Sequence, residues 1–541
     1  MRNKSYIKNA LKLALMAPAL SLSLMLTSCE KETVELMPYD RIPEAEAFAT
    51  AEKIELSMNG VYDAAQTGFY PGGQRGYPFG AASVAQGDMR GEDMVNVAAF
   101  YAYTYESTFD ATTTLNNVTM WESLYGLINK ANLMIEGVQT AAKNGVISQE
   151  VANRYEGEAK FLRALAHHEL VTHFARPYNE TGDASHYGVP YRTIPVNTPA
   201  RVDEAKTQGR NTVKEVYDKL IEDLNFAEAN LPASRTGAVH LTRATKGAAI
   251  ALKTRVNLHK RDWAGVITEA EKIVAGEAAP FTSPIGSYKL TDAPEGPFAG
   301  NKNNVESIFS ILNSANDNPG TNAALAQLYT RPSNRALVAI SPLIYNATFW
   351  PKEDLRRTTL TLSSTAGVFT NKYRDLTTWS DNTPVIRYAE VLLNMSEAIT
   401  RTSGVTPKAL ALLNAVRKRA TSEVYSSSGD AAAYTTIDDS NEMLMAIANE
   451  RRIEFLAEGL RWKDIHRTAK LGEFGVNGVP AKVFYTETKV ADWNAASGTV
   501  RPELLKNIPA LPYASDRFLW PIPTSEITTN PVLAQQQNPG F

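Results

Sequence analysis

The stretch HELVTH, residues 168–173, holds the residue types of a zinc-protease helix. In such a helix the pattern is HExxH, because two histidines four residues apart project from one face and hold one ion. Here His168 and His173 are five residues apart, and this spacing turns the second imidazole about 140° away on a helix. The two cannot ligate one ion, so the sequence predicts packed or surface histidines and no metal site in this stretch.

The other polar residues identify no catalytic centre. His240, His259 and His466 are scattered along the chain, and no G-x-S-x-G, Walker or dinucleotide-binding motif is present. A pair of carboxylates could support glycoside hydrolysis, but no pair stands out among the 58 acidic residues. We therefore expect a binding protein without catalytic residues, and a secreted helical-repeat glycoside hydrolase is the less favoured alternative.

Cys29 is the only cysteine of the 541 residues, so it cannot form an internal disulfide or a cage of several thiolates. It follows a basic start and an apolar stretch, Leu13 to Leu26, which together are typical of a secretory signal peptide. The stretch is shorter than the roughly 20 residues that span a bilayer. The sequence LTSC, ending at Cys29, is similar to the bacterial lipobox, which implies cleavage after residue 28 and a lipid on the Cys29 sulfur. An ordinary signal peptide with an incidental cysteine is the alternative.

The rest of the composition is that of a large globular chain with 44% hydrophobic residues. No other window holds 18 uncharged apolar residues, so no second membrane span is predicted. Residues 1–28 carry four basic and no acidic residues, and their removal leaves 51 basic against 58 acidic residues, a formal charge of −7. This balance argues against a nucleic-acid-binding protein, which would need a basic patch. Neutral or weakly charged ligands fit better.

The elements that must position any functional residues are helical wherever the hydrophobic pattern is clear. Between Ser148 and Ala175 apolar residues recur at spacings of three and four, with Pro177 just beyond the end. Comparable patterns predict helices over Ala45–Ala65, Met120–Ala142, Asn211–Asn230, Thr242–Lys260, Trp263–Ala275, Pro384–Arg401, Pro407–Thr421 and Glu442–Ala469. Several of these helices form close pairs.

Small residues in two of the predicted pairs, Ala248, Ala251, Ala389 and Ala398, would let a second helix approach closely. The pairs are similar to tetratricopeptide repeats, although long segments interrupt the period. A bundle of helix hairpins is the alternative. We expect a mainly α protein with a helical-repeat scaffold.

Two regions break the helical pattern. Residues 66–119 and 276–383 are rich in Gly, Pro, Asn and aromatic residues, so both should be loops with short strands. Tyr101, Tyr103 and Tyr105 alternate, and in a strand they would share one face. Long loops on a stiff scaffold usually carry the binding residues.

Six segments in their order along the chain resemble the SusD/RagB family of outer-membrane nutrient-binding lipoproteins. They are MWESLYGLINKANLMI (120–135), EAKFLRALAHHELVTHFARPY (158–178), RYAEVLLNMSEAI (387–399), ALLNAVRKRA (411–420), NERRIEFLAEGLRWKDIHR (449–467) and FLWPIPTSEITTNPVLAQQQNPGF (518–541). The resemblance implies a SusD-like fold with tetratricopeptide-like units, an N-terminal region over residues 29–275, and a C-terminal region over 276–541 that includes the loop-rich lobe 276–383. The sequence departs from the family pattern at His167-His168, where an aromatic pair is usual.

The resemblance also implies a function and a partner. Such a lipoprotein sits over a SusC-like TonB-dependent transporter and passes it an oligosaccharide, although some relatives handle peptides. Glu30 and Glu32, directly after Cys29, resemble the acidic tether that sends some lipoproteins to the cell surface. We therefore expect a lipid-anchored, surface-exposed protein of the outer membrane that does no chemistry itself and binds no nucleic acid.

The family segments indicate the scaffold of the protein and give little information about its ligand. In NERRIEFLAEGLRWKD the apolar residues should form a buried face with ion pairs at its margin, and the closing segment should be a strap packed on the scaffold. Trp121 should also be core.

The ligand site is expected in the two loop-rich regions. Sugar rings have apolar faces and polar rims, so a suitable site is a shallow platform of aromatic rings with polar neighbours. The predicted platform is Tyr77, Tyr101, Tyr329, Trp350 and Trp379, with Asp88, Asn96 and Arg331 as polar neighbours. The alternative is that these rings pack locally. No cofactor is expected, and NSANDNPG (313–320) is compatible with a structural Ca²⁺.

Overall fold

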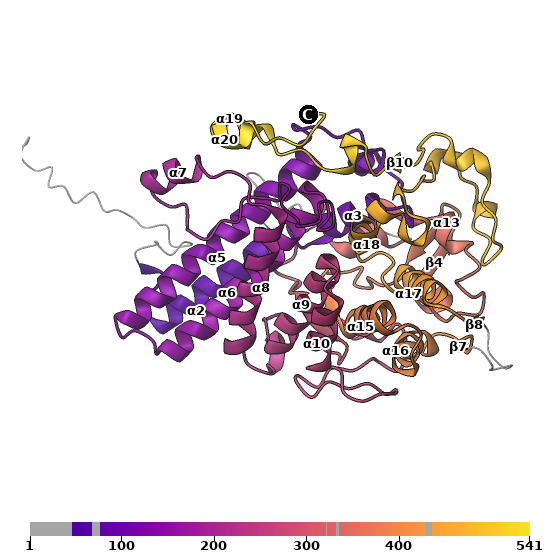
Figure 1. Ribbon diagram of the computed structural model, residues 1–541, viewed down its shortest axis with the longest axis horizontal. Coiled ribbons are helices and arrows are strands. Elements are labelled where there is room, and N and C mark those ends of the chain that lie inside the picture. Colours follow the sequence, from indigo (N-terminus) through magenta and orange to yellow (C-terminus); the bar gives the residue numbers. More distant parts are fainter. Residues whose placement is uncertain (1–45, 68–75, 321, 332–334, 428–434) are drawn as a thin grey trace, which may run out of the picture.

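The computed structural model describes residues 46–67, 76–320, 322–331, 335–427 and 435–541 (Figure 1). Cys29 and the predicted signal peptide lie outside these residues. The described chain is mainly helical, as predicted, and its strands are two to five residues long and pair two by two. None of its helices is long and apolar enough to cross a membrane.

One half of the molecule is built on four long helices that pack side by side (Figure 1). They are α2 (Ala51–Thr67), α5 (Thr119–Lys143), α6 (Gln149–Phe174) and α8 (Val213–Asn230). Helix α6 begins where the Ser148 side chain accepts a hydrogen bond from the N–H of Val151. From Tyr155 to Phe174 every residue of α6 except Lys160 is buried, so α6 is the central helix of this half.

The helix hairpins continue into the second half. Helices α9 (Lys246–Lys260) and α10 (Trp263–Glu271) pack together, α10 packs on α15 (Tyr388–Ser403), and α15 packs on α16 (Pro407–Lys418) and α17 (Ser440–Glu454). The four small residues expected at close helix contacts are all buried. The predicted helical-repeat scaffold is confirmed, with α8 and α9 joining the two halves.

The shorter elements complete the lobe and the surface. The remaining helices are α3 (Ala81–Met89), α4 (Ala102–Tyr105), α7 (Pro199–Ala205), α11 (Gly296–Ala299), α12 (Leu325–Tyr329), α13 (Pro342–Tyr345), α14 (Arg356–Thr359), α18 (Arg461–Thr468), α19 (Thr524–Thr529) and α20 (Pro531–Ala534). The antiparallel strand pairs are β1 (Met94–Asn96) with β3 (Val338–Ile340), β2 (Ser307–Ile311) with β6 (Thr383–Arg387), β4 (Thr361–Ser364) with β5 (Gly367–Thr370), and β9 (Gly478–Val479) with β10 (Leu511–Pro512). β7 (Tyr425–Ser427) and β8 (Thr435–Ile437) pair in parallel.

The single helix predicted over Glu442–Ala469 is wrong, because the chain forms two helices, α17 and α18. Between them Ala457 and Gly459 have φ values of 63° and 73°, which interrupt a right-handed helix. A Cβ on Gly87 of α3 would lie 2.2 Å from the carbonyl oxygen of Gly459. The turn is therefore set by a close approach of two backbones far apart in the sequence.

One further helix boundary is wrong, and the strand considered for the three alternating tyrosines does not form. The helix expected from Pro384 starts at Tyr388, because residues 383–387 form β6 and pair with β2. Tyr101, Tyr103 and Tyr105 lie in consecutive helical turns, not in a strand. Tyr101 and Tyr105, four apart, are buried, whereas Tyr103 is 53% exposed, as a helical period requires.

A buried ion-pair network fastens the loop-rich lobe to α17. Arg387 contacts Glu306 at 2.5 Å, Glu454 at 2.8 Å and Glu458 at 2.7 Å. The other members of the network are Asp354, Arg356, Lys372, Arg417, Arg419 and Glu450. All of these side chains are nearly fully buried, so their charges are matched inside the protein. The predicted buried face with ion pairs in NERRIEFLAEGLRWKD is confirmed.

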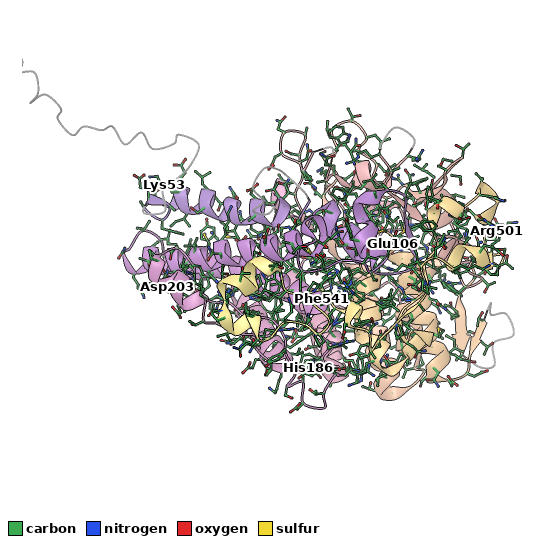
Figure 2. The ribbon with its side chains drawn as sticks, turned by 90° about the horizontal axis from the view of Figure 1, so that it is seen from above. Lys53, Glu106, His186, Asp203, Arg501 and Phe541 are labelled. Carbon is green, nitrogen blue, oxygen red and sulfur yellow. The ribbon has the colours of Figure 1, made fainter. Side chains whose placement is uncertain are left out.

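The C-terminal strap, residues 511–541, crosses the top of the molecule from β10 toward α19 and α20 (Figure 1). Arg210 donates hydrogen bonds to the carbonyl oxygen of Gln536 and to Oδ1 of Asn538, at 2.9 and 2.8 Å. The ring of Phe541 stacks on Phe109 with centroids 6.2 Å apart. Seen from above, Phe541 lies near the middle of an elongated molecule whose ends carry Lys53 and Arg501 (Figure 2). The predicted strap therefore packs on the scaffold.

Candidate functional site

Four of the five aromatic residues predicted to form a ligand platform lie in the core. Tyr77, Tyr101, Tyr329 and Trp350 are each at most 1% exposed. The last three belong to a second hydrophobic core that the lobe builds for itself. Their rings offer no face to solvent, so the predicted platform cannot include them in this structure. The composition of these segments predicted exposed loops, but their aromatic side chains form a packed interior.

Asp88, predicted as a polar neighbour of the ligand, is also buried. Its Oδ2 accepts a hydrogen bond from the hydroxyl of Tyr329 at 2.6 Å, and its Oδ1 accepts one from the N–H of Gly459 at 3.0 Å. Burial raises the pKa of Asp88 to about 7. Asp88 of α3 thus bonds to α12 and to the turn before α18, so its role is structural.

Asn96, Arg331 and Trp379 are the three predicted site residues that reach the surface, and each is half-buried. Asn96 lies on β1, and the Arg331 guanidinium lies over the ring of Phe369, 5.0 Å from its centroid. No contact described in the structure joins these three side chains. Trp379 is therefore the remaining aromatic candidate of the predicted set.

Trp379 is held on a rigid turn. Its φ is 57°, a value that only a well-supported turn tolerates for a bulky residue. The support is the carboxylate of Asp375, which accepts hydrogen bonds from the N–H groups of Thr377, Thr378 and Ser380 at 2.8 to 3.1 Å. Burial alone would raise the pKa of Asp375, but hydrogen bonds from Ser380 and Thr378 hold it well below its usual value.

Neighbouring loops hold the same turn from outside. The ammonium group of Lys302 donates to the carbonyl oxygen of Ser380 and to Oδ1 of Asn382, and the Asn318 amide donates to the carbonyl oxygen of Thr378 at 3.2 Å. The Nε1–H of Trp379 has no partner among the described residues. The turn thus holds a half-buried indole in a fixed position, with its Nε1–H on the buried side, and a face of such a ring can stack on a sugar.

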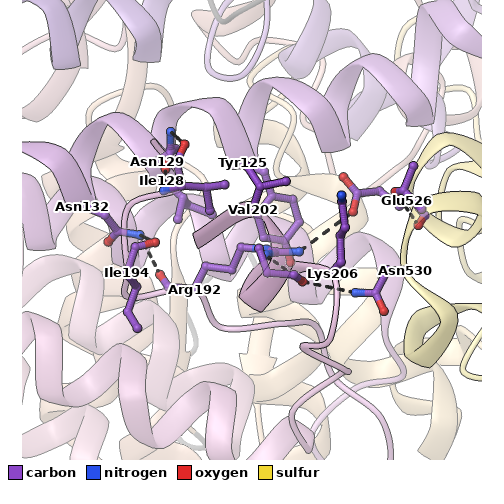
Figure 3. Close-up of a pocket in the computed structure, with 13 residues that line it drawn as sticks. Tyr125, Ile128, Asn129, Asn132, Arg192, Ile194, Val202, Lys206, Glu526 and Asn530 are labelled. Atoms are coloured by element: carbon purple, nitrogen blue, oxygen red, sulfur yellow. Dashed lines mark hydrogen bonds and ion pairs between the residues drawn. The ribbon is translucent and has the colours of Figure 1, made fainter. Parts of the chain in front are cut away.

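A separate pocket of about 330 Å³ lies between α5, α7 and the C-terminal strap (Figure 3). Tyr125 and Asn129 of α5 point into it from one side, and Glu526 and Asn530 enter from the strap. The Asn129 side chain accepts a hydrogen bond from the N–H of Val196 at 2.6 Å, which fixes the wall opposite the helix. The pocket is therefore preformed.

The chemistry of this pocket is mixed. The Arg192 guanidinium lies 4.0 Å from the Glu526 carboxylate and 5.6 Å from the centroid of the Tyr125 ring. Aliphatic side chains, including Ile128 and Val202, line the remaining wall. Such a pocket can hold a small molecule that has both apolar and charged parts.

Sequence reasoning missed Tyr125, Arg192 and Glu526. Tyr125 lies in a segment interpreted as scaffold, and Glu526 lies in a segment interpreted as a strap, about 400 residues away in the chain. No local pattern links the two. Among the described residues, no group of three or more His, Cys, Asp or Glu side chains could hold a metal ion.

Comparisons with known proteins agree with this architecture. A family model described as "Starch-binding associating with outer membrane" matches residues 40–258, and one described as "SusD family" matches residues 353–541. SusD-like protein P38 from Formosa agariphila is 24% identical over 494 residues, which cover 83% of this chain and 90% of that protein. SusD-like protein P2 from the same organism is 26% identical over 420 residues, or 68% and 76% of the two chains.

Solved structures share the whole fold. A SusD superfamily protein from Bacteroides fragilis superimposes with a TM-score of 0.71 and 25% identity, over 90% of this chain and 99% of that one. A laminarin-binding SusD-like protein gives a TM-score of 0.65 at 21% identity, over 91% and 100%. Two family models that together span most of the chain, in the expected order, agree with the structural match. The chain belongs to the SusD family.

Proposed function

We propose that this protein is a glycan-binding lipoprotein of the outer membrane that captures oligosaccharides and delivers them to a SusC-like TonB-dependent transporter. The family description and the laminarin-binding relative support a carbohydrate ligand. The lipobox-like sequence ending at Cys29 supports lipid anchoring. The protein would bind its cargo without converting it.

The observation that carries the proposal is the Trp379 turn. A pyranose ring has an apolar C–H face that packs on an indole, and its hydroxyl groups need donors and acceptors nearby. Trp379 supplies a half-buried ring whose Nε1–H is turned away from solvent, so its contribution is the apolar face. Because Asp375 and Lys302 fix the turn before any ligand arrives, little conformational entropy is lost on binding.

Replacement of Trp379 by alanine tests this proposal. Loss of one stacked ring removes about 1 to 2 kcal/mol, so we expect the Kd for laminarin or soluble starch in titration calorimetry to rise at least about fivefold. Trp263→Ala is the matched control, because it removes a half-buried indole from α10, where Arg261 and Arg401 lie over the ring. Equal affinities of Trp379→Ala and wild type would refute the role of Trp379.

The same titrations separate glycan binding from the alternatives. A panel of short peptides should give no heat, and incubation with either glucan should release no new reducing ends. Tight peptide binding without glycan binding would move the protein to a different ligand class. Release of reducing ends would make it a hydrolase.

The anchor and the partner need cell experiments. Cys29→Ala should move the protein from the membrane fraction to the soluble fraction. Affinity purification of the wild-type protein from the outer membrane should recover a TonB-dependent barrel. Recovery of the protein without lipid in the periplasm would refute the anchoring part of the proposal.

A further inference from the structure

Another hollow lies along α17. We call it the α17 groove; it has a volume of about 590 Å³, and its walls come from α17, from β8 and from the segment before Trp350. It shares no lining residue with the Trp379 turn or with the pocket between α5 and α7. Its size is within the range of ligand sites in proteins.

An aromatic ring and aliphatic groups form its floor. Phe349 is half-buried, although the next residue, Trp350, is 1% exposed. The Arg452 guanidinium lies 5.3 Å from the centroid of the Phe349 ring and is itself paired with Asp93, so it backs the ring and stays neutralised. Met445, on α17, is 39% exposed beside it. Apolar surface from these two side chains is therefore open to solvent.

Neutral polar groups surround that floor. Asn441, Met445 and Asn449 are four residues apart and form one stripe of α17. The side-chain amides of Asn441 and Asn449 make no hydrogen bond with any other described residue. Each can both donate and accept.

The groove is almost free of charge. No lysine or arginine is among the described residues that line it, and its one acid is Glu442, whose carboxylate already accepts a hydrogen bond from the N–H of Asp438 at 2.7 Å. An anionic ligand would find no counter-charge here and would lose hydration, and a cationic ligand would find only the carboxylate of Glu442, which is already hydrogen-bonded. A neutral ligand with apolar faces and many hydroxyl groups would lose least.

We propose that the α17 groove is a second carbohydrate site and binds a neutral oligosaccharide. One pyranose face packs on Phe349 and Met445, while its hydroxyl groups exchange hydrogen bonds with Asn441 and Asn449. This inference rests on the proposed function, which supplies the ligand class, but the residues of the α17 groove do not include Trp379. Two sites on one protein would hold a long glycan more tightly than a short one, because the second contact is intramolecular.

The test uses the purified protein with laminariheptaose, maltoheptaose and laminarin as probes. Phe349→Ala should raise the Kd for laminarin about fivefold to tenfold, as expected for a lost ring contact. Asn449→Asp keeps the shape of the side chain but removes its donor, and it should raise the Kd about threefold or more. Leu471→Ala, which trims another exposed apolar side chain (56% exposed), is the control and should bind like wild type.

Crystals soaked in laminariheptaose or maltoheptaose give a direct readout. Ring density against Phe349 from either probe supports the inference, and an empty groove in both soaks overturns it. Wild-type affinity in both Phe349→Ala and Asn449→Asp also overturns it, provided that thermal unfolding shows both variants folded. If Trp379→Ala loses binding while these two variants do not, the carbohydrate site in the α17 groove is refuted and the proposed function stands. If wild type binds none of the probes, the proposed function fails together with the groove.

Discussion

His168 makes the stability of this protein depend on pH in a way that can be calculated. The imidazole is fully buried in α6, with its ring centroid 4.8 Å from that of His259 and 6.1 Å from that of Tyr217. Neither ring nitrogen has a hydrogen-bond partner among the described residues. Burial, with a further contribution from the charge of Arg255, lowers the pKa of His168 well below its usual value.

The sign of the effect follows from the two protonation states. In the unfolded chain His168 has a pKa of about 6.5 and takes up a proton as the pH falls, whereas in the folded protein it stays neutral. The unfolded state therefore binds more protons below about pH 6.5, and stability is lost as the pH falls through that value. Between pH 7.5 and 5.5 the loss from this one group is about 1.4 kcal/mol.

The assay is urea unfolding of wild type and of His168→Phe at pH 7.5, 6.5 and 5.5, followed by tryptophan fluorescence. Phenylalanine has a similar shape and cannot titrate, so its packing effect is the same at each pH. Relative to wild type, the variant should gain about 1.4 kcal/mol of unfolding free energy between pH 7.5 and 5.5. Every other titrating group, including Asp88, is common to both proteins and cancels.

Tyr217→Phe is the control for this comparison. It removes a hydroxyl that has no partner among the described residues, from a ring that packs near the His168 ring, and it changes no group that titrates near neutral pH. Its difference from wild type should be the same at all three pH values. Parallel curves for His168→Phe and wild type would show that the imidazole titrates in the folded state, which would refute the reasoning.

Three further changes test the packing that holds the lobe and the strap. Glu454→Gln should lower the unfolding free energy by about 3 to 5 kcal/mol, because it unbalances the buried ion network. Burial alone would raise the pKa of Glu454, but the charges of Arg419 and Arg387 outweigh burial and lower it to about 2. The stabilisation that the Glu454 carboxylate provides is therefore present at neutral pH and is lost as the pH falls below about 4.5. A denaturation series at pH 7 and pH 4 measures both effects, and equal losses at the two pH values would contradict this account. Gly87→Ala should cost about 1 to 3 kcal/mol, measured by thermal unfolding, since its Cβ would meet Gly459. Arg210→Ala should make residues 511–541 more sensitive to trypsin because it removes the hydrogen bonds to the strap, and an unchanged cleavage rate would show that these bonds do not hold it.

The scaffold could be predicted because its signals are local. The start of α6 follows from Ser148, and its burial follows from apolar residues at helical spacing. The break between α17 and α18 could not be predicted in the same way. It depends on the contact of Gly459 with Gly87, which lies 372 residues earlier in the chain, and no hydrophobic period records such a contact.

Candidate ligand residues are harder to predict than the scaffold, because composition does not distinguish an exposed ring from a buried one in irregular segments. Phe349 and Trp350 are neighbours, and the larger, more conspicuous tryptophan is the buried one. Outside helices and strands no fixed period assigns side chains to a face. Burial there is decided by long-range packing, such as the core that Trp350 shares with Tyr101 and Tyr329.

The second core also explains how an irregular lobe can serve as a rigid binding surface. Because Tyr329 and Trp350 fill its interior and Arg387 joins it to α17 through buried ion pairs, the lobe does not need long strands to keep its shape. Packing and ion pairs elsewhere in the lobe can then offset the strain of surface turns, such as the positive φ of Trp379. The carboxylate of Asp375 holds one such turn through three backbone N–H groups, so at Trp379 the hydrogen bonds of the turn indicate a ring near the surface better than the number of aromatic residues does.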